Sequence, residues 1–228
     1  LAGFHVGQRR AAFAACGTTL CVFLVVLDKQ HRRKITMFLI PFLVCFALYL
    51  GAFWNSNSAI GSFAKTIKSG FVTDKSSLSE EDYLSNLWRD IEKYNLAVTV
   101  QRAPIIGVGY GNKYDQPIKP LEDLWSLDGY VPHNMMLDVI VKSGAIGCFI
   151  FWFFMNGTAF YGASLYAKLQ DPYLKVICIV GLAMIVNQMV VSYFDLQLTY
   201  TRNMVLLGIF IGLLTNLKKI DEREHGPL

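Results

Sequence analysis

Arginine and histidine side chains stand at positions in this sequence where they could act together on a substrate. Arg89 lies in a polar helical segment, and Arg9 and Arg10 directly precede an apolar segment. A guanidinium group stays charged and makes forked contacts with phosphate. His133 follows Pro132, where an apolar helix is expected to begin, and the dipole of that helix would favour an uncharged imidazole that can accept a proton. The pattern therefore offers anion binding beside a general base, with a solvent-facing capping histidine as the alternative interpretation.

The segment after Arg102 is rich in glycine. Gly107, Gly109 and Gly111 make a tight turn whose exposed backbone N–H groups could contact an anion. The spacing is not a dinucleotide-binding fingerprint, because no strand–helix unit encloses it. An anion-binding turn and a purely structural turn both remain open as interpretations, and Arg102 is a second candidate for contact with an anion.

Other catalytic patterns are absent from the sequence. It contains neither the Gly-x-Ser-x-Gly motif of hydrolases nor the His-Glu-x-x-His motif of zinc proteases. The five cysteines all lie in apolar segments and are interpreted as small buried hydrophobic residues. Glu122, Asp123 and Asp128 imitate a metal-binding set, but ordinary loop polarity explains them, and neither a metal nor another cofactor is predicted.

Long apolar segments must position these side chains. Hydrophobic residues make up 54% of the 228-residue chain and charged residues only 17%, against about 25% charged residues in a soluble domain. This composition excludes a disordered chain and a basic nucleic-acid-binding domain. A helix needs about 20 apolar residues to cross a bilayer, and continuous apolar runs indicate helices. We expect an all-α integral membrane fold with about five spans, at Ala11–Leu27, Ile35–Phe53, Gly144–Tyr166 (with extra turns from His133), Tyr173–Phe194 and Asn203–Leu217 (or with an extension back to Leu198).

Basic residues predict the orientation of these spans. Nine of them, in the turns at 28–34 and 168–175 and in the tail at 218–228, fall on one side of the membrane if five spans alternate. Short loops rich in Lys and Arg face the cytoplasm. The chain then divides into two spans (1–53), one long extracytoplasmic loop (54–132), three spans (133–217) and a cytoplasmic tail (218–228).

The long loop contains helical periodicity of its own. A possible capping box at Ser77–Glu80 and a stop at Pro104 predict a helix over 79–102. Its apolar stripe runs through Leu84, Leu87, Trp88, Ile91, Asn95 and Val98, which places Arg89, Glu92 and Lys93 on the polar face.

Polar residues in and beside the spans are expected to pair. Asp138 and Lys142 are four residues apart on one helix and predict an ion pair at the membrane boundary. Asn156 and Asn187 lie deep in spans and predict hydrogen bonds between helices.

Several of these motifs together resemble the bacterial O-antigen ligase and polysaccharide polymerase superfamily. The resemblance rests on the Arg-Arg-Ala-Ala-Phe opening of a span, on a basic turn before a long loop, and on the order of motifs within that loop. That order is an Arg, then Pro-x-x-Gly-x-Gly, a variable insert, His-Asn, a helix and Ser-Gly-x-x-Gly. The resemblance covers nearly the whole chain, which we expect to be the C-terminal half of a protein with further spans.

The resemblance implies a metal-independent, inverting glycosyltransferase of the bacterial inner membrane. Its donor would be an undecaprenyl-diphosphate-linked glycan at the outer face, and its acceptor a lipid A core sugar or another glycan. By motif position, the catalytic residues fall on Arg10, Arg89 and His133, with Arg9, Arg102, Asn134, Gly107 and Gly109 as candidate substrate contacts. The double arginine leaves Arg9 a competitor of Arg10.

Two other functions stay open at this level. A transporter or flippase for lipid-linked sugars would be expected to show internal repeats or broken spans, and no repeat is evident in the sequence. A non-catalytic membrane sensor would make the placement of Arg89 and His133 incidental.

Overall fold

Helices make up most of the part of the chain that the computed structural model describes. That part comprises residues 2–55, 58, 61, 64, 80–119, 129–193 and 196–225, without the side chains of 2–13 and 80–86. The α-helices are α1 (Ala2–Val26), α2 (Lys29–Phe53), α4 (Glu80–Arg102), α5 (Met135–Lys168), α6 (Pro172–Val191) and α7 (Thr201–His225), with a short 3-10 helix, η2 (Gln197–Thr199), before α7. The prediction of an all-α fold is confirmed.

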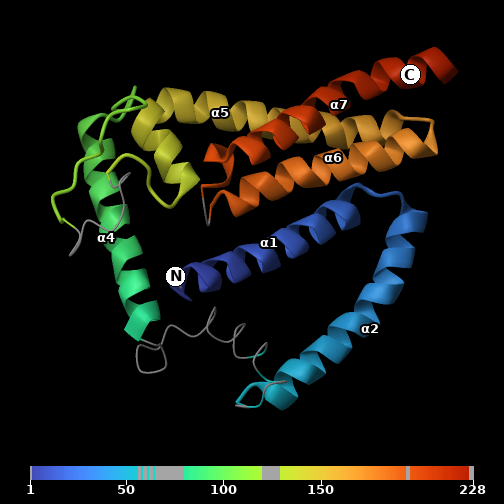
Figure 1. Cartoon of the computed structure of the whole chain (residues 1–228). Helices are drawn as coiled ribbons and strands as arrows, with labels where there is room; N and C mark the ends of the chain where they lie inside the picture. Colours follow the sequence, from blue (N-terminus) through green and yellow to red (C-terminus); the bar gives the residue numbers. More distant parts are fainter. Residues whose placement is uncertain are drawn as a thin grey trace.

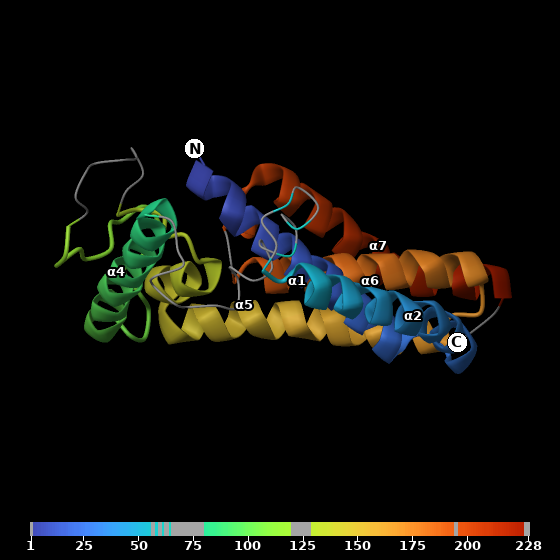
Figure 2. The ribbon, with the colours of Figure 1, turned by 90° about the horizontal axis from the view of Figure 1, so that it is seen from below.

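Helix α6 forms the centre of a bundle. It contacts α1, α5 and α7, and Figures 1 and 2 show these four helices running together. The core between them consists of apolar side chains such as Met155, Cys178, Ile185 and Leu214. Helix α2 leaves the far end of α1 and buries none of its side chains, whereas α4 stands across the opposite end of the bundle (Figure 1). The bundle thus has two distinct ends.

The predicted spans agree with the observed helices in number and place. Helices α2, α5, α6 and α7 are long and apolar enough to cross a membrane, and α1 contributes the shorter apolar stretch Ala14–Val26. The chain is therefore a multi-pass membrane protein. The boundaries differ from those predicted, because α1 starts at Ala2, α6 ends at Val191, and α7 continues beyond Leu217 to His225.

Helix α5 is too long to be a single span. Its 34 residues would extend about 51 Å at 1.5 Å per residue, whereas the hydrocarbon core is about 30 Å thick. A break at Gly144, with φ 64° and ψ −168°, divides the helix. The turns Met135–Ser143 precede the break, as expected for extra turns after His133, and the span proper starts at Gly144.

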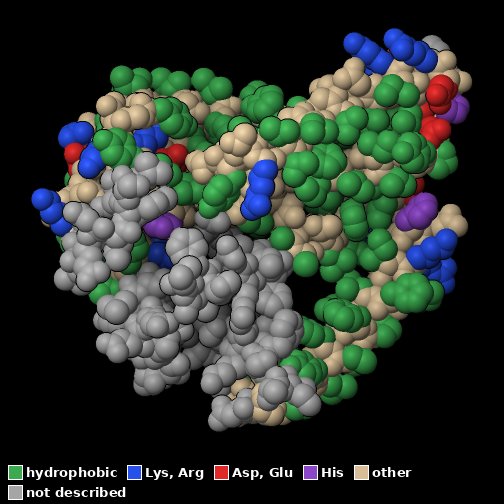
Figure 3. Space-filling view, viewed as in Figure 1, with side chains coloured by type: hydrophobic (Ala, Val, Ile, Leu, Met, Phe, Trp, Pro, Cys, Tyr) green, Lys and Arg blue, Asp and Glu red, His purple; other side chains and the backbone are tan. Residues whose placement is uncertain are grey.

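Basic turns from different parts of the sequence gather at the end of the bundle opposite α4. Lys175 at the start of α6 lies 3.9 Å from Asp28 in the α1–α2 turn. Asp221 on α7 is fully buried and accepts hydrogen bonds from the backbone N–H groups of Gln170 (2.8 Å) and Asp171 (3.1 Å). Figure 3 shows Lys and Arg side chains at the end of α7 and at the α1–α2 turn. The bundle brings the predicted cytoplasmic charges together, and the side of the membrane that they face stays a prediction.

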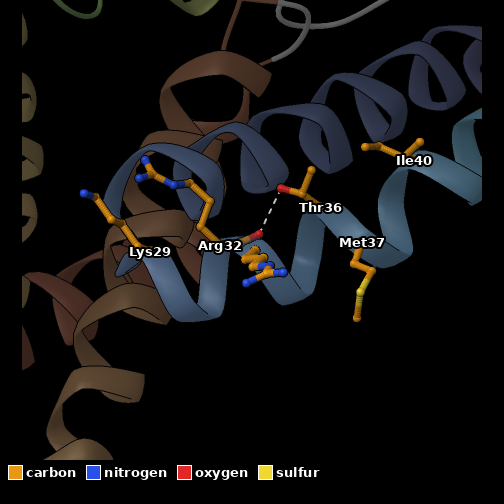
Figure 4. Close-up of a pocket in the computed structure, with 6 residues that line it drawn as sticks. Lys29, Arg32, Thr36, Met37 and Ile40 are labelled. Atoms are coloured by element: carbon orange, nitrogen blue, oxygen red, sulfur yellow. Dashed lines mark hydrogen bonds between the residues drawn. The ribbon is translucent and has the colours of Figure 1, made fainter.

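A shallow hollow lies at this basic end, along α2. It has a volume of about 430 Å³ and is lined by Lys29, Arg32, Arg33, Thr36, Met37 and Ile40. The Thr36 hydroxyl donates a 2.9 Å hydrogen bond to the carbonyl of Arg32, as drawn in Figure 4. The hollow is separated from α4 by the length of the bundle (Figure 1), so it is not where the candidate catalytic side chains lie.

The predicted hydrogen bonds between spans are not formed among the residues that the structure describes. The Asn156 amide donates to the carbonyl of Trp152, one turn earlier in the same helix, at 2.7 Å. The side-chain oxygen of Asn187 is buried without a hydrogen-bond partner among the described residues. That prediction was wrong for Asn156, because an exposed amide can donate its hydrogen bond to a carbonyl group of its own helix, as Ser and Thr side chains do.

Candidate active site

Three polar residues of α4 face the protein and not solvent. Glu92 is 4% exposed, Asn95 1% and Thr99 0%, whereas Leu87 on the predicted apolar stripe is 40% exposed. The prediction that Glu92 lies on the outer polar face was therefore wrong. Buried polar groups need hydrogen-bond partners, and this face receives them from the loop that follows α4.

Two residues of this face bind the backbone of that loop. The Asn95 amide donates to the carbonyl of Ile118 (2.8 Å) and accepts from its N–H (3.2 Å). The Thr99 hydroxyl accepts a hydrogen bond from the N–H of Asp115 at 2.8 Å. Helix periodicity alone cannot show these partners, because they are 16 to 23 residues distant in sequence.

Glu92 makes the contact that matters most for the candidate chemistry. Its Oε2 accepts a hydrogen bond from the backbone N–H of His133 at 3.0 Å, and its Oε1 lies 3.1 Å from the His133 ring atom Nδ1. The Glu92 side chain is 5% exposed and that of His133 35% exposed. The imidazole is thus fixed on its buried edge and partly open to the surface.

Arg89 lies one turn before Glu92 on α4. It is half-buried and makes no hydrogen bond or ion pair with any part of the chain that the structure describes. Residues three apart on a helix are neighbours on its surface, so Arg89 and the Glu92–His133 contact share one side of α4. Arg89 thus lies one helical turn from the residue that contacts His133, and a joint action of Arg89 and His133 on a substrate stays a prediction.

Arg9 and Arg10 lie on the first turns of α1. The N-terminus of α1 and helix α4 lie at the same end of the bundle in both ribbon views (Figures 1 and 2), and the two helices are in contact. The side chains of Arg9 and Arg10 lie outside the described residues, so their contact with Arg89 or His133 stays a prediction.

Asn134 and Arg102 have structural partners. The Asn134 side chain caps α5 by accepting from the N–H of Leu137 at 3.1 Å, and its amide donates to the carbonyl of Tyr193 at 2.9 Å. Arg102 donates to Asp115 at 2.7 Å. His133 is therefore placed beside a capped helix start, as expected, and the contact of Asn134 and Arg102 with substrate stays a prediction.

The glycine-rich turn docks into the break of α5. We call the two segments together, 104–109 and 141–146, the glycine lock. Gly107 and Gly144 both have positive φ angles, of 69° and 64°. A Cβ atom on Gly107 would lie 2.5 Å from the carbonyl carbon of Lys142, and one on Gly144 would lie 2.2 Å from the carbonyl oxygen of Ile105. Only glycine lets the two backbones approach so closely.

Backbone hydrogen bonds hold the glycine lock together. The break at Gly144 removes two helical bonds, which would join residues 145 and 146 to 141 and 142. Four bonds to the loop replace them: Val108 N to Val141 O (2.9 Å), Gly109 N to Lys142 O (2.9 Å), Ala145 N to Pro104 O (2.8 Å) and Ile146 N to Ile105 O (3.2 Å).

The lock gives the Pro-x-x-Gly-x-Gly and Ser-Gly-x-x-Gly motifs a structural role. The N–H groups of Gly107 and Gly109 donate to the carbonyl groups of Ala103 and Lys142. The interpretation of this segment as a structural turn is thus supported, and contact of Gly107 or Gly109 with an anion stays a prediction.

Asp138 and Lys142 do not form the predicted ion pair. The Lys142 ammonium instead donates to the carbonyl of Asn112. Asp138 is 4% exposed, and its Oδ1 has no hydrogen-bond partner among the described residues. Burial raises the pKa of this carboxyl group to about 6, although the charge of Lys142 opposes the shift. The two residues lie before the break at Gly144, where the loop supplies a competing acceptor.

Glu92 is the site residue that sequence reasoning missed. Its charge and its place beside Lys93 are typical of a solvated helix face, and its partner His133 is 41 residues away. Its spacing of three residues from Arg89 is a signal that could have suggested a shared face. The acidic residues Glu122, Asp123 and Asp128 and the predicted capping serine Ser77 lie outside the described residues.

Comparison with known proteins identifies the family. A family model described as O-antigen ligase matches residues 1–152, which is 152 of 228 residues and contains α1, α2, α4, His133 and the whole glycine lock. No curated protein and no solved structure matches the chain. Because the family model covers more than half of the sequence, this multi-pass membrane protein belongs to the O-antigen ligase family, whose general role is the ligation or polymerisation of glycans.

Proposed function

We propose that the protein transfers a glycan from an undecaprenyl-diphosphate carrier to a sugar hydroxyl at the outer face of the bacterial inner membrane. The acceptor is a lipid A core sugar or another glycan. The observation that carries this proposal is the contact of His133 with Glu92 on α4, because Glu92 lies one helical turn from Arg89, which has no hydrogen-bond or ion-pair partner among the described residues.

Arg89 serves in this proposal to bind the diphosphate of the carrier. The leaving group departs with negative charge, and donors that already point at that charge lower the barrier. A half-buried arginine that pairs with none of the described residues is suited to receive an anion. Arg10 on α1 supplies the second guanidinium group. Loss of one such donor is expected to cost about 3–4 kcal/mol in the transition state.

His133 serves as the general base. The acceptor oxygen attacks the anomeric carbon, its proton passes to the imidazole, and the bond between that carbon and the diphosphate oxygen breaks with its electron pair leaving on the diphosphate. Direct displacement inverts the anomeric centre. The two guanidinium groups provide the positive charge in this scheme, so the reaction is expected to proceed without a divalent metal.

The two ends of the bundle support the outer-face assignment. The basic turns lie together at one end, and such turns face the cytoplasm. Helix α4 stands across the other end (Figure 1), which faces outwards if the basic end faces inwards. A carrier lipid lying in the outer leaflet could then bring its diphosphate to α4.

A glycan-transfer assay in detergent tests the proposal. It uses the purified full chain and an undecaprenyl-diphosphate-linked oligosaccharide. His133→Ala and Arg89→Ala should each reduce turnover, by about 10²–10⁴ for the base, and chelation by EDTA should not. Lys93→Ala is the matched control, because Lys93 lies on α4 in an exposed ion pair with Asp90. Turnover near the parent value in His133→Ala would refute the base assignment. In lipid vesicles, movement of the carrier between leaflets without glycan transfer would favour a transporter.

A further inference from the structure

The two carboxylate oxygens of Glu92 contact two nitrogen atoms of the same residue. One accepts the backbone N–H of His133 at 3.0 Å and the other lies 3.1 Å from the ring Nδ1. The side chain is 5% exposed, and a buried carboxylate is costly unless hydrogen bonds compensate for its lost hydration. Glu92 thus holds both the backbone and the ring of His133 against α4.

This contact decides which ring nitrogen carries the proton. An ionised carboxylate can only accept hydrogen bonds, so the ring nitrogen facing Glu92 must be a donor. In a neutral imidazole, one nitrogen donates and the other accepts. A proton on Nδ1 therefore places the basic lone pair on Nε2.

We propose that Glu92 is a positioning residue that holds His133 in the Nδ1–H tautomer, with its basic Nε2 directed to the acceptor hydroxyl. The inference rests on the proposed function, in which His133 is the general base. When Nε2 takes the proton of the acceptor hydroxyl, the ring becomes an imidazolium, and the adjacent carboxylate stabilises that charge. Glu92 itself keeps its charge throughout and exchanges no proton.

Glu92 also links the position of His133 to that of Arg89. Arg89 and Glu92 are three residues apart on α4 and so lie on one side of the helix. A displacement of α4 would move the guanidinium group and the ring of His133 together. Glu92 is therefore expected to fix the distance between the bound diphosphate and the base as well as the tautomer.

Substitution of Glu92 by glutamine tests the proposal sharply. Glutamine has nearly the same size, but it has one acceptor oxygen where the carboxylate has two. If that oxygen accepts from the His133 backbone, the amide group faces Nδ1 as a donor and favours the opposite tautomer, with hydrogen on Nε2. Such a ring cannot accept the proton of the acceptor hydroxyl. Glu92→Asp keeps both acceptor oxygens on a shorter side chain.

The first measurement is the tautomer itself. Nitrogen-15 NMR of histidine-labelled full chain in detergent distinguishes a protonated Nδ1 from a protonated Nε2, and His133→Ala assigns the signal. We expect an Nδ1–H ring in the parent protein and a shift towards Nε2–H in Glu92→Gln. His225, whose Nδ1 lies 3.3 Å from Asp221, serves as an internal control that the substitution should not alter.

The second measurement is catalysis. Glu92→Gln should lower kcat by about 10²–10⁴, the range of general-base catalysis, with little change in KM for the carrier-linked glycan. Glu92→Asp should recover part of this loss. Asp90→Asn is the matched control on α4, because it makes the same carboxylate-to-amide change in an exposed ion pair, and it should leave kcat unchanged.

The outcomes separate this inference from the proposed function. Full activity of Glu92→Gln with an inactive His133→Ala would overturn the role of Glu92 alone. Full activity of His133→Ala would overturn the base assignment as well. An Nε2–H ring in the parent protein would contradict the positioning role without any activity measurement, and this test applies even if Glu92→Gln fails to fold.

Discussion

Replacement of Gly144 by alanine should show how strongly the glycine lock holds the loop to α5. The added Cβ would lie 2.2 Å from the carbonyl oxygen and 2.3 Å from the carbonyl carbon of Ile105. Backbone cannot give way as a flexible side chain does, so the loop must move away from the break. Such a movement would weaken the four hydrogen bonds that replace the two lost from α5.

The magnitude follows from two separate costs. A non-glycine residue at a positive φ such as that of Gly144 costs roughly 1–3 kcal/mol, and each backbone hydrogen bond that is lost costs about 0.5–1.5 kcal/mol. If two of the four bonds break, Gly144→Ala should destabilise the protein by about 2–6 kcal/mol. Gly111→Ala carries the first cost only, because Gly111 has φ 85° with no atom near its Cβ position, and Gly212→Ala carries neither.

Thermal unfolding in one detergent measures the three variants side by side. We expect Gly144→Ala to lower Tm most, Gly111→Ala to lower it less, and Gly212→Ala to leave it unchanged or raise it slightly, because alanine is the better helix former. If Gly144→Ala proves no less stable than Gly111→Ala, the close approach of the two backbones does not contribute to stability, and the account of the lock is wrong.

Two further substitutions test buried carboxylates. The folded-state pKa of Asp138, about 6, lies above its ordinary value, so its ionised form costs stability, and that cost grows as pH rises from about 4 through 6. Asp138→Asn should therefore stabilise the protein at pH 7.5 by about 1–3 kcal/mol, with a smaller gain at pH 5; thermal unfolding at the two pH values checks this, and an equal gain at both would contradict it. Asp221→Ala should destabilise by about 1–3 kcal/mol, because the N–H groups of Gln170 and Asp171 lose their acceptor; an unchanged Tm would show that solvent replaces Asp221 at the basic end.

The spans were predictable from the sequence because they depend on composition more than on partners. Lipid requires a continuous apolar segment whose backbone is satisfied within a helix, so α2, α5, α6 and α7 follow from hydropathy with boundary errors of a few residues at most ends. Helix α4 was also predictable in extent, since Pro104 stops it two residues after its observed end at Arg102.

The orientation of α4 was not predictable by the same means. Helical periodicity identifies a buried face by its apolar residues, but α4 buries Glu92, Asn95 and Thr99 against backbone groups of the loop. Those acceptors and donors come from segments that periodicity does not describe. For the same reason the glycine motifs could be recognised as a turn, although the break in α5 that receives them could not.

The placement of His133 depends on backbone contacts with three different elements. Glu92 on α4 binds the His133 N–H, the next residue caps α5, and the N–H of Met135 donates to the carbonyl of Ser192 at the end of α6, at 3.2 Å. The candidate base therefore lies where α4 meets the bundle of spans. Because Glu92 is the only one of these contacts on α4, a shift of α4 would change the position of the His133 ring while α5 and α6 stay in place.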